Sequence, residues 1–92
     1  MLDKHLILGV HITDRATHVE QVQKLFSEYG QNIKTRLGLH DMHEESCASS
    51  CVIILELTGD EQNCHDLAAK LAEIEGVYTK EMIFDHPWLN KE

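Results

Sequence analysis

The richest concentration of chemically reactive side chains lies between residues 40 and 51. This segment reads HDMHEESCASSC and contains His40, His43, Cys47 and Cys51 together with three carboxylates. Imidazole and thiolate are ligands that zinc and nickel favour, and spacings of three to four residues let one loop supply several of them. The segment is therefore a candidate site for a divalent transition metal, nickel or zinc, with these four residues as its candidate ligands.

Two other interpretations fit the same segment. Its small and polar residues could form only a connection between two strands, with Cys51 buried in the second strand. Alternatively, Cys47 and Cys51 could form a redox-sensing pair. The chain has three cysteines, and an odd number favours free thiols or metal ligands over a disulfide framework. The third, Cys64, falls on the apolar stripe of a predicted helix, where cysteine usually acts as a small core residue.

Asp14, Arg15 and Arg36 form a second candidate site, for a small anionic ligand. Lys34 and Arg36 are the only close basic pair and lie on the outer face of a predicted strand. They could hold a carboxylate or a phosphate, or could instead pair with some of the many acidic side chains. Asp14 and Arg15 follow the first predicted strand, where the amides at the start of a helix could receive an anion. Thr13 or Asp14 is the expected cap of that helix.

Composition excludes several functional classes. The 92 residues include 16 acidic and 8 basic side chains, giving a net charge of −8. Because phosphate contacts need clustered lysine and arginine, this balance argues against direct nucleic-acid binding. No stretch approaches the ~20 apolar residues of a membrane span, and no signal peptide is visible, so we expect a cytoplasmic protein without a membrane partner. Because no catalytic motif is present either, we expect a binding protein rather than an enzyme.

Six regularly patterned segments position these candidates. The two-residue period predicts strands over 5–12, 32–40, 51–58 and 77–84. Apolar residues at steps of three and four predict one helix between the first two strands, from about Ala16 to Tyr29. The same spacing predicts a second helix between the last two strands, with its apolar stripe running from Cys64 to Ile74.

The order of these segments predicts an α+β fold, the ferredoxin-like βαββαβ sandwich. Right-handed crossovers place both helices on one face of an antiparallel four-stranded sheet. We expect one domain over 1–92, with a core over 5–84 and a polar tail over 85–92. The other sheet face would be bare and partly apolar, because Ile7 and the run Val52–Leu55 contribute to it. A monomer rarely exposes such a patch, so we expect a homodimer or tetramer joined there.

The chain resembles the family of iron-only hydrogenase system regulators, which are ACT-like domains. The resemblance rests on GVHITDR at the end of the first strand, RLG in the second, an aliphatic third strand, and KLAEIEGV before the last strand. It implies a regulatory role linked to a hydrogenase or its maturation. ACT-type dimers bind small ligands at subunit interfaces beside the loop after strand 1, which here is Thr13–Arg15.

The third strand also resembles the C-terminal regulatory domain of the nickel-responsive repressor. There, a cysteine that begins this strand binds nickel together with two histidines of the second strand; Cys51 and His40 match two of these positions, and Gly38 replaces the other histidine. Two functions therefore remain in view. One is a metal- or ligand-sensing regulatory module that acts as a homo-oligomer. The other is a ligand-free adaptor for a partner protein.

Overall fold

The computed structural model describes residues 4–39 and 51–85. Its elements are, in chain order, β1 (Lys4–Ile12), α1 (Val19–Glu28), the short 3₁₀ helix η1 (Gly30–Asn32), β2 (Ile33–Leu39), β3 (Cys51–Leu57), α2 (Glu61–Ala72) and β4 (Val77–Asp85). This order confirms the predicted βαββαβ pattern. Asp85 belongs to β4, so the predicted tail begins one residue too early, and its remainder lies outside the described residues.

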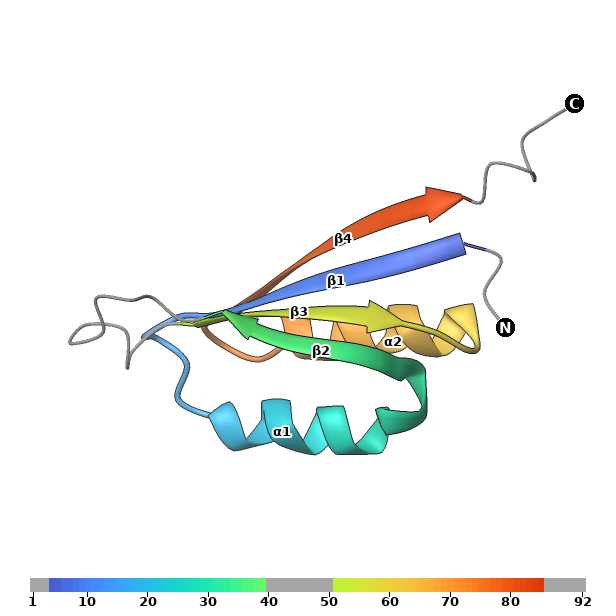
Figure 1. Ribbon diagram of the computed structural model, residues 1–92. Coiled ribbons are helices and arrows are strands. Elements are labelled where there is room, and N and C mark those ends of the chain that lie inside the picture. Colours follow the sequence, from blue (N-terminus) through green and yellow to red (C-terminus); the bar gives the residue numbers. More distant parts are fainter. Residues whose placement is uncertain (1–3, 40–50, 86–92) are drawn as a thin grey trace, which may run out of the picture.

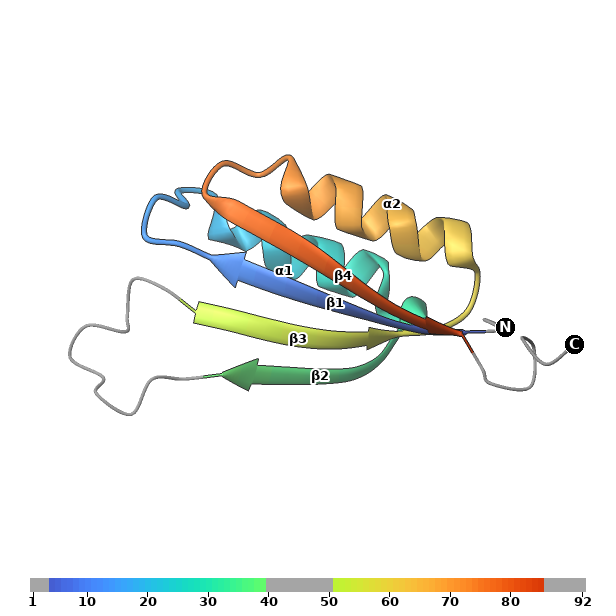
Figure 2. The same cartoon turned by 90° about the horizontal axis from the view of Figure 1, so that it is seen from above.

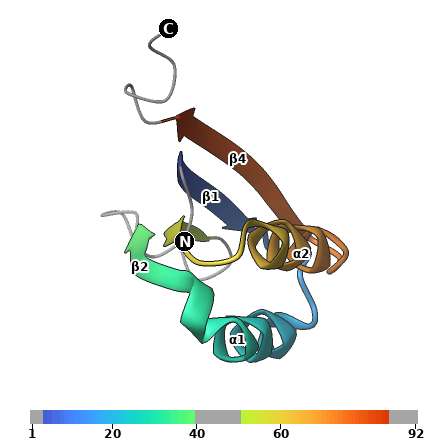
Figure 3. The same cartoon turned by 90° about the vertical axis from the view of Figure 1, so that its right-hand side faces the viewer.

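The four strands form one antiparallel sheet in the order β2-β3-β1-β4. Both helices cover the same face of this sheet, as the views in Figure 1 and Figure 2 show. Looking along the sheet, Figure 3 shows α1 and α2 side by side in a single layer. The architecture is therefore the predicted α+β, ferredoxin-like sandwich of one sheet and one helix layer.

The core lies between the sheet and the helices and follows the predicted periodicities. On the central strand β1, every second side chain is buried, and Leu6, Leu8 and Val10 have no exposed surface. The helix layer contributes residues from both helices and from the turn after α2: Val22, Phe26, Cys64, Leu67, Ala68, Leu71 and Ile74. Fully burying each aliphatic side chain contributes roughly 1.5–3 kcal/mol, so this layer is the main source of stability.

Helix α1 begins later than the sequence indicates. Its first residue is Val19, and neither Thr13 nor Asp14 caps it, which corrects the predicted cap. The Thr13 hydroxyl instead donates a hydrogen bond of 2.7 Å to the Gly76 carbonyl oxygen. Helix α2 has the expected cap, because the Asp60 carboxylate accepts a 2.9 Å hydrogen bond from the Gln62 amide. Within the described residues, no helix is long and apolar enough to cross a membrane.

Strand β2 contains an irregularity that changes which way its side chains point. Ile33 pairs with Leu57 and Thr35 with Glu56, so the register shifts by one residue between them. Such a bulge moves every later side chain to the other face of the sheet. Arg36, which pairs with the buried Leu55, therefore faces the helices, whereas strict alternation had placed it on the outer face.

Candidate functional site

The β1–α1 loop is fixed to the turn that precedes β4. Two bonds join Thr13 to the Gly76 carbonyl oxygen, one from its amide at 2.9 Å and one from its hydroxyl at 2.7 Å. The Ala16 amide donates back to the Thr13 carbonyl oxygen at 3.1 Å, and the Arg15 amide to the Thr13 hydroxyl at 3.3 Å. The loop backbone is therefore well defined, while the side chains of Asp14 and Arg15 are exposed on its surface.

Gly76 makes this junction possible. Its φ of +83° lies in the left-handed region, and a Cβ placed there would come within 2.7 Å of the Ala16 Cα and of the Arg15 carbonyl carbon. Only glycine avoids both the backbone strain and this collision. The EGV phrase at 75–77 thus has a structural reason: it lets the loop pack directly on the turn.

Cys51 is the one predicted metal ligand that the structure describes. It begins β3 opposite Ile12 and packs half-buried against the core, on the helix side of the sheet. His40, His43 and Cys47 lie outside the described residues. Among residues 4–39 and 51–85, no three histidine, cysteine or acidic side chains are grouped so that they could hold a metal ion.

Arg36 does not lie with Asp14 and Arg15. Its guanidinium carbon stands 4.8 Å from the centre of the Phe26 ring, and its Nη2 atom donates a weak 3.5 Å hydrogen bond to the Gln23 side chain. This is a cation–π contact with α1, so the side chain helps to attach the edge strand to the helix layer. The structure gives Arg36 this packing role and does not bring the three anion-site candidates into contact.

The face of the sheet turned away from the helices, here called the open face, is covered mainly by apolar side chains. Alternation from the buried β1 residues and the strand register assign to it Ile7, Leu37, Val52, Ile54, Tyr78, Met82 and Phe84. All four strands contribute. Leu37, Tyr78, Met82 and Phe84 each leave more than half of their surface exposed. Monomeric proteins rarely expose a contiguous apolar patch of this kind.

Charges on the open face are few and partly paired. Glu56 is the only carboxylate that the described strands place there, and it lies 3.7 Å from His5 Nδ1 and 3.9 Å from Lys34 Nζ. Thr35 also donates to it, at 3.4 Å. Lys80, the register partner of Gly9, adds a second cation. The strongly acidic character of the chain is therefore carried elsewhere on its surface.

A second polar cluster, which the sequence patterns did not reveal, joins α2 to β4. The two ring nitrogens of His65 face two carboxylates, with Nε2 3.1 Å from Glu61 and Nδ1 3.4 Å from Glu81. Lys4 approaches the same Glu61 oxygen at 3.5 Å. Hydrogen bonding to Glu61 and, more weakly, to Glu81 raises the pKa of His65, and hydrogen bonding to His65 lowers the pKa of Glu61. The spacing of four residues between Glu61 and His65 is the signal that could have indicated half of it.

The third cysteine behaves as expected of a core residue. Cys64 has no exposed surface, and its thiol points toward the Thr58 carbonyl oxygen at 3.5 Å. Burial, together with nearby carboxylates, raises the pKa of this thiol. The thiolate is the reactive form of cysteine, so Cys64 is suited to packing rather than to metal binding or redox chemistry.

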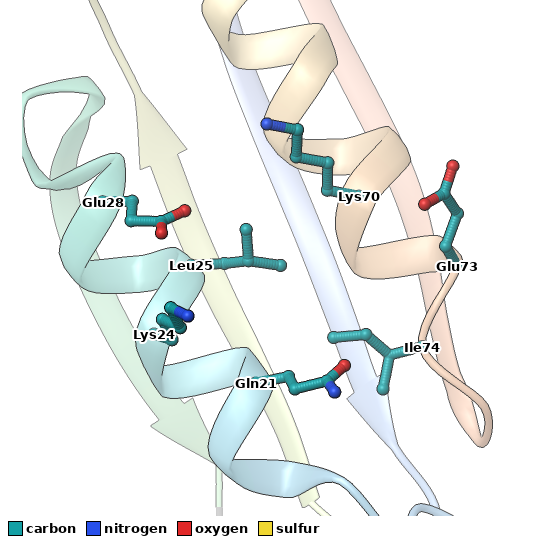
Figure 4. Close-up of a pocket in the computed structure, with 7 residues that line it drawn as sticks. All are labelled: Gln21, Lys24, Leu25, Glu28, Lys70, Glu73 and Ile74. Carbon is teal, nitrogen blue, oxygen red and sulfur yellow. The ribbon is translucent and has the colours of Figure 1, made fainter.

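A shallow groove separates the two helices on the outer surface of the helix layer. Figure 4 shows its lining, in which Leu25 of α1 and Ile74 after α2 reach toward each other and charged residues stand around them. The Lys70 ammonium at its margin lies 5.3 Å from the centre of the Tyr29 ring. The groove is open and mixed in charge, and it lacks the convergent polar groups of an enclosed ligand site.

The strand order and the single helix layer define a small ferredoxin-like α+β domain whose other sheet face is apolar and is not covered by any described part of the chain. Comparison with known families then places it. The model of the TM1266-like family, the iron-only hydrogenase system regulators, matches residues 4–81. The chain therefore belongs to this family, which confirms the resemblance drawn from the sequence; the family description is that of a regulator and names no ligand.

Three solved structures are also similar to the chain, and the first of them belongs with the family assignment. Protein TM1266 from Thermotoga maritima, which has no assigned function, is similar at a TM-score of 0.71 and 28% identity, over 87% of this chain and 96% of that one. A formyltetrahydrofolate deformylase from Pseudomonas putida is similar at a TM-score of 0.49 and 14% identity, over 90% of this chain and 29% of that one. A nitrogen regulatory PII-like protein from Thiomonas intermedia, bound to ADP, AMP and bicarbonate, is similar at a TM-score of 0.49 and 13% identity, over 92% of each chain. No curated protein matches the chain.

Proposed function

We propose that this chain is a small regulatory domain of the hydrogenase system that works as a homodimer, with the open faces of two sheets packed against each other. The observation that carries the proposal is the apolar cover of the open face, to which all four strands contribute. Exposing it to water is unfavourable at roughly 25 cal/mol for each Å². A small domain whose core gives limited stability gains from covering such a face in an oligomer.

Charge supports a second copy as the occupant. Two chains of net charge −8 repel each other unless their acidic residues stay away from the contact. The open face meets this condition, because its one strand carboxylate, Glu56, already lies near Lys34 and His5. Two such faces can therefore approach without bringing unpaired carboxylates together.

The size of the face is also of the right order. Four strands about 4.8 Å apart and about seven residues long, at ~3.3 Å per residue, give a flat footprint on the order of 400 Å². Projecting side chains enlarge the accessible area well beyond this footprint. A standard interface buries roughly 800 Å² on each partner. The open face supplies the centre of such an interface, and its surroundings would supply the rim.

The test compares two exposed apolar residues, one on the open face and one away from it. Leu37 on β2 is 54% exposed, and Val19 at the start of α1 is 41% exposed. Leu37→Glu should convert the dimer to a monomer in light scattering at micromolar concentration. Val19→Glu, the matched control, should leave the dimer intact. A dimer that resists Leu37→Glu, or a monomeric parent chain, would overturn the proposal; the monomer would favour the adaptor alternative.

A metal-sensing role is the second candidate function, and the position of Cys51 favours it. This half-buried thiol stands where the segment 40–50, with its two histidines and Cys47, joins β3. Titrating the reduced, untagged chain with Ni²⁺ and with Zn²⁺ in a calorimeter should show saturable binding that Cys51→Ser weakens at least tenfold. Cys64→Ala is the matched control and should leave the affinity unchanged. No heat above the buffer control would refute the metal site.

A further inference from the structure

Gly9 lies near the centre of the open face, and nothing in the described part of the chain requires a glycine there. Its φ is ordinary, because only Gly59 and Gly76 have positive values among the described glycines. A Cβ built on it would stand 3.8 Å from the Lys80 carbonyl oxygen and 3.9 Å from Ile54 Cδ1, which are normal contact distances. A side chain would therefore fit the folded monomer without strain.

A glycine in a strand interior nevertheless has a cost. It is less favourable than alanine by roughly 0.5–1 kcal/mol, because more backbone freedom is lost on folding and no side chain packs. Gly76, in the turn before β4, has a reason within the chain to be a glycine, because the loop at Ala16 occupies the space that its side chain would need. Gly9 has no such neighbour within the part of the chain that the structure describes. One remaining reason for a strand glycine is the close approach of another molecule.

The neighbours of Gly9 indicate what approaches. In the register, Gly9 lies between Ile54 of β3 and Lys80 of β4, with Ile7 two residues earlier on the same strand. Ile54 in turn pairs with the exposed Leu37. The bare backbone at Gly9 is thus bordered by the aliphatic side chains of Ile7 and Ile54, while Lys80 and His11 stand on its other two sides. An aliphatic side chain of the partner fits such surroundings, and the open face of a second copy supplies several.

We infer that Gly9 is the point of closest approach between the two sheets of the homodimer, where an aliphatic side chain of the second copy rests on the bare β1 backbone. This inference rests on the proposed dimer and adds the contact that fixes how the faces stack. It makes Gly9 a residue of the interface rather than of the fold. A side chain added there would hold the sheets apart while leaving each protomer folded.

The test measures the dimer dissociation constant by sedimentation equilibrium for Gly9→Leu, Gly9→Ala and Thr35→Leu. Gly9→Leu should raise the constant at least tenfold, and Gly9→Ala should raise it by a smaller factor. Thr35→Leu adds the same leucine on the edge strand of the same face and should leave the constant within about threefold. The effect on the protomer itself is measured by combining Gly9→Leu with the monomeric variant Leu37→Glu. Circular dichroism should show native secondary structure for this double variant. Its unfolding midpoint should be no lower than that of Leu37→Glu alone.

The outcomes separate the inference from the proposed function. A parent chain that dimerises through the open face, with Gly9→Leu leaving the constant unchanged, overturns the role of Gly9 and keeps the dimer. A monomeric parent chain overturns both. If Gly9→Leu fails to fold, the Gly9→Ala constant decides, because its single added carbon has room in the protomer; no change for Gly9→Ala would then contradict the inference.

Discussion

At the scale of single residues, Gly76 carries the largest local constraint. Gly76→Ala forces a side chain into a left-handed backbone and against Ala16, so it should lower the free energy of unfolding by at least about 2 kcal/mol. Gly30→Ala is the control, because no atom lies within 4 Å of its added carbon and its φ is not positive. The control should change stability by less than about 0.5 kcal/mol in urea denaturation. Equal effects of the two variants would contradict this account of the loop junction.

His65 makes a pH-dependent contact between α2 and β4. Because both ring nitrogens face carboxylates, the protonated ring is favoured, and NMR titration should give His65 a pKa above the ordinary 6.5. Glu81→Gln should lower this pKa. Glu75→Gln removes a carboxylate from the turn before β4 and should leave it unchanged. A His65 pKa at or below 6.5 in the parent chain would show that the cluster does not form in solution.

The same cluster sets a pH window for its contribution to stability. The folded-state pKa of His65 is raised, so its contribution is complete below about 6.5 and disappears as the pH rises through the folded value. The pKa of Glu61 is lowered, so its contribution is complete above about 4.5 and disappears as the pH falls through the folded value. Both contributions are therefore present between about pH 4.5 and 6.5. The effect is modest, because all of these side chains are partly exposed.

At the scale of elements, the edge strand β2 is attached to the helix layer partly through Arg36. Arg36→Ala removes its contact with the Phe26 ring and should destabilise the protein by about 0.5–1 kcal/mol in thermal or urea unfolding. Lys24→Ala, which removes an exposed cation from α1, is the control and should have a smaller effect. If Arg36→Ala leaves the free energy of unfolding unchanged, the guanidinium does not stack on the ring in solution.

The elements that could be predicted from the sequence are those whose pattern is local. Strict alternation along β1 and the apolar run of β3 gave their positions almost to the residue, because one buried face requires that pattern. The face of Arg36 could not be predicted this way, since the bulge before it depends on pairing with β3. The start of α1 was missed for a similar reason. Thr13 has the chemistry of a helix cap, but its hydroxyl bonds a residue 63 positions away.

The candidate site was predictable only in part. Residue types alone drew attention to the donors between His40 and Cys51, and the structure describes Cys51 of these. The bare, apolar face was expected from Ile7 and the run Val52–Leu55, and the structure adds the larger exposed residues Leu37, Tyr78, Met82 and Phe84. Their contribution became visible only with the register, because alternation within a single edge strand does not say which face is covered.

At the scale of the whole molecule, the two faces of the sheet differ: one is buried under the helices and the other is exposed. The two helices cover one face of the sheet (Figure 3), around a core of mainly aliphatic residues. The opposite face is apolar and is not covered by any described element. The family is that of the iron-only hydrogenase system regulators, and its description names no ligand. The open face is therefore the feature on which the functional account depends, whether or not the His40–Cys51 segment binds a metal.

The measurement that tests this account most directly is the molecular mass of the unmodified chain in solution. Sedimentation equilibrium from about 1 to 100 μM should give twice the 10.5 kDa of one chain, or a higher multiple, with dissociation only toward the dilute end. A mass of one chain across that whole range would contradict the central claim, because the open face would then remain exposed in the free protein.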